Sequence, residues 1–231
     1  MKYNRNTFYC FSPLVMILTF IIEMSMILYT LWRYKASLVT RLAIMMFGFL
    51  ALFQLAEFLV CRGLGGDALL WSRIGFISIT MLPPIGIHLV YTLAGAKKQP
   101  LVIPAYILAA LFMGFFALVG RSIDGHACLG NYVIFQVAPG LGGLYGLYYY
   151  ASLIAALGLG WYFIRHTTND KIKKSLKALM FGYAIFLIPT TSVGFLSPET
   201  LSGIPSIMCG FAVLLALTVS FIVLPLSARR K

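Results

Sequence analysis

The sequence predicts an all-α membrane protein, a seven-transmembrane helix bundle with the N-terminus outside and the C-terminus cytoplasmic. Of its 231 residues, 61% are hydrophobic and 10% are charged, and the mean hydropathy is +0.92, above the range of soluble globular proteins. Seven apolar stretches each reach roughly 20 residues, the length that a helix needs to cross a bilayer. Lysine and arginine are concentrated in alternate connections, which gives the orientation.

The seven stretches are joined by short connections, so little chain remains for a separate soluble domain. We therefore expect a single domain over residues 1–231. Unbroken apolar runs such as "IMMFGFLALF" exclude a transmembrane β-barrel, whose strands alternate apolar and polar residues. The expected helices cover residues 10–32, 39–61, 71–93, 101–119, 141–163, 176–196 and 203–226.

Basic residues are distributed unequally between the two sides of the predicted bundle. With the N-terminus outside, thirteen of the 18 lysines and arginines fall on the cytoplasmic side, as the positive-inside rule requires. The net charge of +12 is then explained by topology and by anionic lipids at the cytoplasmic surface, without a nucleic-acid partner. The expected location is a bacterial inner membrane. The cytoplasmic set is Arg33, Lys35, Arg41, Lys97, Lys98, Arg165, Lys171, Lys173, Lys174, Lys177, Arg229, Arg230 and Lys231.

All four cysteines fall in the outer half of this topology, where an oxidising compartment allows disulfides to persist. No CxxC spacing occurs, so neither a metal cluster nor a redox motif is expected. Cys209 lies in an apolar stretch and suits the role of a small hydrophobic residue. Cys128 lies in the polar segment "RSIDGHACLGN", and we predict a disulfide from it to either Cys61 or Cys10.

Polar side chains within membrane spans are costly, so they are usually paired or functional. Gln54 and Glu57 share one face of the second span, and Arg73 and Thr80 share one face of the third. The turn "GLGGD" places Glu57 and Arg73 at similar depth, which favours a salt bridge between them. We predict that these four residues border a cavity that opens to the outside.

The third span also carries "MLPPIGIHLVY", in which Pro83 and Pro84 remove backbone hydrogen bonds and bend the helix. We expect the bend to form the floor of the cavity or a hinge. His88 and Tyr91 follow on the polar face. A lone histidine is more often a packing residue than a ligand, and no second histidine lies at matched depth for a haem.

Glu23 lies near the middle of the first span without an evident partner. Two interpretations stay open. It is either protonated, or hydrogen-bonded to Arg73, His88 or a hydroxyl group.

The stretch "GLGGLYGLYYYASLIAALGLGWYF" combines small and aromatic residues. Gly142 and Gly146 permit close approach of another helix, from this chain or from another membrane protein. Four tyrosines crowd its outer half, as an interfacial belt with packing or as the wall of a site for a flat apolar ligand. Tyr145 and Tyr149 are the candidate ligand contacts.

Three segments together carry a family resemblance. "FQLAEFLVCRGLGGDALLWSRIGFISITMLPPIGIHLVYTL" holds an acidic residue, an aromatic-x-Arg start and a mid-helix proline. With "RHTTNDKIKKSLKALMFGYAIFLIP" and "IPSIMCGFAVLLALTVSFIVLPL", it resembles the seven-transmembrane N-terminal sensor region of bacterial histidine kinases. The resemblance implies a sensory role. In that family the last helix continues into a kinase domain, whereas "SARRK" follows here, so we expect no output domain.

The sequence shows no HExxH, GxSxG or phosphate-binding glycine loop, and no convergent acid, base and nucleophile, so we expect no enzyme. No cofactor is identified. The favoured function is a sensor-like or ligand-binding membrane module with an outward-facing cavity. An amphipathic or flat apolar ligand with one anionic group would suit Arg73. An accessory subunit packing against membrane partners or pigments is the second possibility, and a small transporter is the third.

Overall fold

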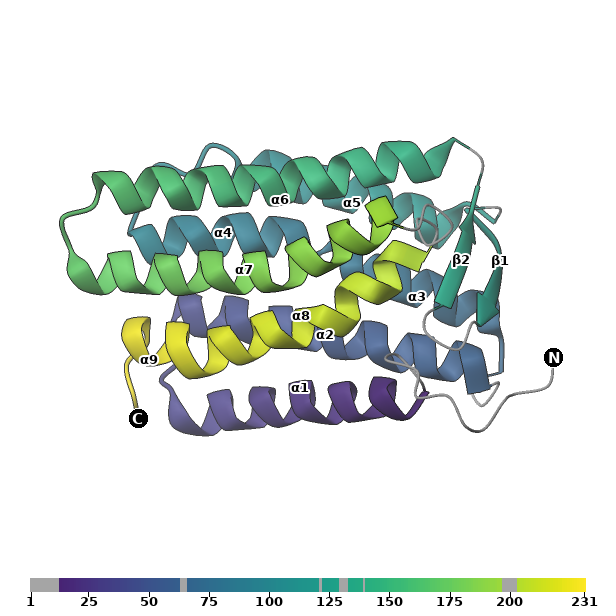
Figure 1. The fold of residues 1–231 in the computed structure, drawn as a ribbon, viewed down its shortest axis with the longest axis horizontal. Coiled ribbons are helices and arrows are strands. Elements are labelled where there is room, and N and C mark those ends of the chain that lie inside the picture. The colour runs from purple at the N-terminus through teal and green to yellow at the C-terminus, as the bar shows by residue number, and fades with distance from the viewer. Residues whose placement is uncertain (1–12, 63–65, 121, 129–132, 139, 197–202) are drawn as a thin grey trace.

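The computed structural model describes residues 13–62, 66–120, 122–128, 133–138, 140–196 and 203–231. Its helices lie side by side along the long axis of an elongated bundle, with a β-hairpin at one end (Figure 1). The helices are α1 (Pro13–Arg33), α2 (Leu38–Arg62), α3 (Ala68–Thr80), α4 (Leu82–Ala94), α5 (Val102–Leu118), α6 (Leu141–His166), α7 (Asp170–Leu196), α8 (Ile204–Thr218) and α9 (Leu224–Ser227). A π-helix, η2 (Val219–Val223), joins α8 to α9, and the strands are β1 (Ile123–Cys128) and β2 (Val133–Val137).

The described chain has the character of a membrane protein. Five of its helical segments are long and apolar enough to cross a bilayer: Leu14–Arg33, Leu38–Arg62, Ala68–Ala94, Leu141–His166 and Ile204–Ser227. α5 is equally apolar but shorter. Large apolar side chains face outward on several helices, among them Leu111 (65% exposed), Leu147 (67%) and Ile188 (64%). Contact of so much apolar surface with lipid tails is favourable, whereas its contact with water is unfavourable.

Two predicted helix boundaries differ from the structure for local reasons. The third span divides into α3 and α4 at Met81, directly before the two prolines. α7 begins at Asp170 instead of residue 176, because the Asn169 side chain accepts hydrogen bonds from the backbone N–H groups of Lys171 and Ile172 at 3.0 and 3.3 Å. The prediction from hydropathy started at residue 176 because the first turns of α7 are polar. The beginning of the first predicted span, residues 10–12, lies outside the described residues.

The all-α prediction was wrong for the segment after α5, which forms a β-hairpin. β1 and β2 pair antiparallel, with Cys128 opposite Val133 and Ile123 opposite Val137. Pairing supplies the hydrogen bonds that an extended segment needs where it folds back over the bundle.

The two ends of the bundle differ in what they carry. At the hairpin end lie the β-hairpin, the end of α2 and the start of α8 (Figure 1). At the opposite end, Val39, Leu93, Asn169 and Leu226 border one small pocket, so the starts of α2 and α7 meet the ends of α4 and α9 there. All thirteen predicted cytoplasmic basic residues belong to the helix ends and connections on this side, which we call the basic end.

Candidate functional site

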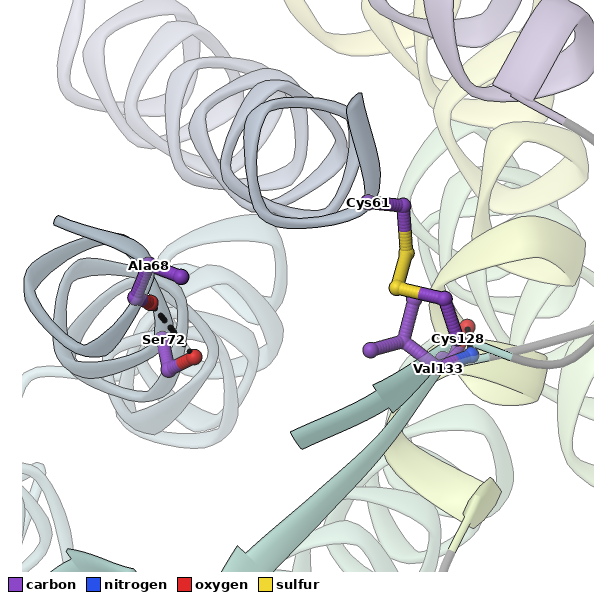
Figure 2. The surroundings of a disulfide bond; sticks show 6 residues. Cys61, Ala68, Ser72, Cys128 and Val133 are labelled. Atoms are coloured by element: carbon purple, nitrogen blue, oxygen red, sulfur yellow. Dashed lines mark hydrogen bonds between the residues drawn. A yellow bond between two sulfur atoms is a disulfide. The ribbon is translucent and has the colours of Figure 1, made fainter. Parts of the chain in front are cut away.

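A disulfide joins Cys61, at the end of α2, to Cys128, at the end of β1, with a Cα–Cα distance of 5.7 Å. Figure 2 shows Cys61 reaching from α2 to Cys128 beside Val133, where β2 begins. The prediction of a disulfide at Cys128 is confirmed, with Cys61 as the partner; Cys10 lies outside the described residues. Cys209 is free and buried, as predicted.

A second contact holds the other strand of the hairpin. The backbone N–H of Val133 donates to the Ser206 hydroxyl of α8 at 3.2 Å, and Ser206 also lies within hydrogen-bonding reach of the Glu57 carboxyl of α2. The hairpin is therefore fixed covalently to α2 and by a hydrogen bond to α8.

A cavity of about 720 Å³ lies directly under this hairpin, between α3, β2, α6 and α8. Its volume is within the range of small-molecule sites in proteins. The lining is mainly apolar and aromatic, and its described part contains no lysine, arginine, aspartate or glutamate. Both predicted aromatic contacts border it. The residues that shape it include Phe76, Phe135, Tyr145, Tyr149, Pro205 and Met208.

Glycine creates one wall of the cavity. Gly142, Gly143 and Gly146 of α6 line it, and a Cβ atom at any of the three would meet no other atom of the described residues within 4 Å. The close helix approach expected at Gly142 and Gly146 is therefore not made by any described helix of this chain. It occurs lower on the same helix, where a Cβ on Gly160 would collide with the Met180 side chain of α7.

The prolines of the third span are held by the tyrosines of α6. Pro84 has no N–H to donate to the Thr80 carbonyl four residues earlier. The Tyr148 hydroxyl donates to that carbonyl at 2.8 Å, and the Tyr145 hydroxyl lies 3.0 Å from the Thr80 hydroxyl. We call Thr80, Pro84, Tyr145 and Tyr148 the kink junction. Its hydrogen bonds replace the one that the proline removes.

The kink does not form the cavity floor that the sequence suggested. Ile79 lines the cavity, but neither Pro83 nor Pro84 nor Thr80 is among the described lining residues. The bend lies beyond the cavity, and Tyr145 is the residue that belongs to both.

The expected salt bridge between Glu57 and Arg73 is not formed in the described part of the chain. Arg73 donates from Nη2 to the Gly120 carbonyl at 2.6 Å, which ties α3 to the segment after α5, whereas Glu57 is 1% exposed and faces Ser206 of α8. Neither residue borders the cavity. The hairpin symmetry predicted equal depth, but it did not fix the rotation of each helix about its axis.

His88 and Tyr91 are packing residues in α4. Nδ1 of His88 lies 3.3 Å from the Tyr106 hydroxyl, and the Tyr91 and Phe163 rings pack edge to face with their centroids 5.6 Å apart. Across the described residues, no group of three or more His, Cys, Asp or Glu side chains is placed to hold a metal ion.

A second set of polar residues lies between α1, α2 and α8, and we call it the acidic seam. It comprises Glu23, Gln54 and Glu57, whose side chains are 0%, 2% and 1% exposed. Both carboxyl oxygens of Glu23, the Gln54 amide nitrogen and Oε1 of Glu57 lack a hydrogen-bond partner among the described residues. Glu23 and Glu57 both lie close enough to Cys209 of α8 to interact with it electrostatically.

Sequence reasoning missed the cavity residues contributed by β2 and α8. Phe135, Gln136 and Met208 line the cavity, yet none had a chemical signature that singled it out. The run "YVIFQV" after "GN" is rich in β-branched and aromatic residues, which is the usual signal of a strand.

No protein-family model matches the sequence, and no curated protein is significantly similar to it.

Proposed function

We propose that the protein is a non-enzymatic, sensor-like integral membrane protein that binds a neutral apolar molecule in the cavity at its hairpin end. The observation that carries the proposal is the cavity of about 720 Å³ with its aromatic wall and glycine face. Since no charged side chain is among its described lining residues and Arg73 contacts Gly120, the ligand class shifts from an anionic molecule to an uncharged one. Tyr149 and Gln136 offer polar contacts at the wall.

The proposal includes the full topology. Seven spans arise when α5 and α7 are added to the five long apolar segments, with α3 and α4 counted as one. The basic end then faces the cytoplasm, and the disulfide lies on the oxidising side of a bacterial inner membrane. The cavity consequently lies in the outer half of the bilayer, within reach of molecules dissolved in the outer leaflet.

A sensory role fits the path of α8. Pro205 and Met208 border the cavity, and the same helix continues through η2 and α9 to the basic end. A ligand that moves the start of α8 would therefore act on the cytoplasmic side of the bundle. The resemblance to sensor regions of bacterial histidine kinases supports the same role.

An accessory subunit is the second candidate, and a specific surface favours it. An apolar groove of about 700 Å³ runs between α4, α5 and α6, bordered by Leu108, Leu111 and Leu147 among others. A transmembrane helix of a partner or an apolar pigment would fit against it. A small transporter is the third candidate; the kinked third span and Pro189 inside α7 favour it.

Native mass spectrometry of the protein released from mild detergent tests the proposal. We expect a single chain that carries a neutral organic molecule, which organic extraction then identifies. A constant set of additional subunits would favour the second candidate. A chain that carries only phospholipid after gentle extraction would contradict the ligand-binding proposal.

A further inference from the structure

The acidic seam places an uncompensated carboxyl group inside the bundle. Glu23 is the tenth residue after the start of α1, about 15 Å along the helix axis, and its side chain is fully buried. Among the described residues neither carboxyl oxygen of Glu23 has a hydrogen-bond partner, and Cys209 of α8, which lies close to both Glu23 and Glu57, supplies no positive charge. The two arginines of α2, Arg41 and Arg62, lie in its first and last turns, away from its middle. A charged carboxylate in such surroundings has neither solvent nor counter-ion.

The unpaired atoms of the seam form a series in depth. Glu57 lies about 8 Å from the hairpin end of α2, and Gln54 lies one turn deeper on the same face. Glu23 is deeper again, on α1, the helix that packs most extensively against α2. Ser206, which contacts both Glu57 and the hairpin backbone, stands at the outer end of the series.

The unpaired atoms of the acidic seam include both a hydrogen-bond donor and hydrogen-bond acceptors. Gln54 offers an N–H donor, while Glu57 and Glu23 offer carboxyl oxygens. A metal cation would satisfy the oxygens only and would be repelled by the amide donor. A proton on a carboxyl group converts an acceptor into a donor and removes the buried charge at the same time.

We propose that Glu23 is a proton-binding site inside the membrane bundle, and that its proton exchanges with the hairpin end by way of Gln54 and Glu57. Uptake converts a carboxylate oxygen to a hydroxyl and leaves the group neutral. Release transfers the same proton to the Glu57 carboxylate, after Glu57 has given up its own proton toward the hairpin end, and Gln54 keeps its hydrogens throughout. The site is distinct from the ligand cavity, and it does not depend on the proposed ligand.

Cys209 gives the seam and the cavity a common wall. Its side chain borders the cavity, and it also lies close enough to Glu23 and Glu57 to interact with both electrostatically. A change in the charge of Glu23 or Glu57 therefore acts directly on a helix that lines the cavity.

Infrared spectroscopy of the full-length chain in lipid nanodiscs tests this proposal. The sequence has only six acidic residues, so the C=O stretch of a protonated carboxyl is resolved from few candidates. We expect wild-type protein at neutral pH to show this band, Glu23→Gln to lose the Glu23 component of it, and Glu57→Gln to keep that component while its shift in D₂O becomes severalfold slower. The matched control is Ser25→Ala, an exposed position two residues away on α1, which should change neither property.

The outcomes are decisive in either direction. A wild-type spectrum without a protonated carboxyl band at neutral pH would overturn the proposal, and it requires no variant to fold. A band that is the same in Glu23→Gln as in the wild type would also overturn the assignment, and exchange that is unchanged in Glu57→Gln would overturn the route. Glu23→Asp provides a second test, since it should retain a band at a displaced frequency.

Discussion

The hairpin end and the basic end of the bundle are stabilised in different ways. The hairpin end is cross-linked by the Cys61–Cys128 disulfide and by hydrogen bonds from the Arg73 side chain to the Gly120 carbonyl and from the Val133 backbone N–H to the Ser206 hydroxyl, yet it encloses the large cavity. The basic end has hydrogen bonds between its connections, from the backbone N–H of Lys35 to the carbonyl of Arg229 at 2.9 Å and from the Lys231 side chain to the carbonyl of Leu31. Its pocket measures only about 170 Å³.

The difference indicates what the cross-links are for. A hollow region loses the packing contacts that stabilise the rest of a bundle. The disulfide and the kink junction restore rigidity around the hollow without filling it. Toward the basic end α6 and α7 pack closely, at Gly160 against Met180, and no disulfide is found among the described residues there. The hairpin end thus combines a covalent bond and side-chain hydrogen bonds with a cavity that stays unfilled.

The largest effect is expected from a test of sidedness, because the comparison assumes that the two ends face opposite compartments. A green fluorescent protein fused after Lys231 should fluoresce in bacterial cells, and alkaline phosphatase fused at the same place should be inactive. An active phosphatase would place the basic end outside and remove the explanation of the disulfide by compartment.

Breaking the disulfide should produce the largest change in stability. Cys61→Ser should lower the free energy of unfolding by roughly 4 kcal/mol, since the bond closes a loop of 67 residues. Chemical denaturation in detergent micelles measures this. Cys128→Ser and the double variant should match the single one, and Cys209→Ser should change stability little by comparison. Unequal effects of Cys61→Ser and Cys128→Ser would contradict a purely cross-linking role.

Breaking the kink junction should lower the free energy of unfolding by less than breaking the disulfide does, and by an amount that depends on Pro84. Tyr148→Phe leaves the Thr80 carbonyl without its donor and should cost about 1–3 kcal/mol. Pro84→Ala returns an N–H at position 84, so Tyr148→Phe should cost less in that background. The same denaturation experiment gives the coupling energy. Equal costs with proline and with alanine would show that the hydroxyl does not compensate for the missing bond.

The sequence predicted those parts of the fold that depend on composition and on sequence spacing. Apolar length identified five segments that are long enough to cross a bilayer, and the polar surroundings of Cys128 indicated a disulfide there, with Cys61 as one of two possible partners. Proline chemistry located the break in the third span, although Tyr148 as the compensating donor was not foreseen. These inferences succeed because each depends on local chemistry or on depth in the membrane.

The rest of the site depends on how each helix is rotated and on which neighbour it meets. Glu57 and Arg73 each lie five residues from the turn-side end of their helices, but they face α8 and the segment after α5, respectively. The glycines of α6 fit a helix interface and an open space equally well, and only the position of β2 decides between them. No local pattern carries that information.

The most direct test of the central claim, that the hairpin end holds a binding cavity, is to fill the space by substitution. In Gly146→Leu the new side chain enters open space in the cavity wall. Gly158→Leu is the matched control, because Gly158 is exposed on the same helix outside the cavity, and a Cβ atom there also meets no atom of the described residues within 4 Å. Both should fold at least as well as the wild type, because leucine favours a helix over glycine by roughly 1 kcal/mol. A photoactivatable neutral alkylphenol should label the wild type and Gly158→Leu on Gly142–Tyr150, and Gly146→Leu should lose that labelling. Equal labelling of the two variants, at equal stability, would contradict the account.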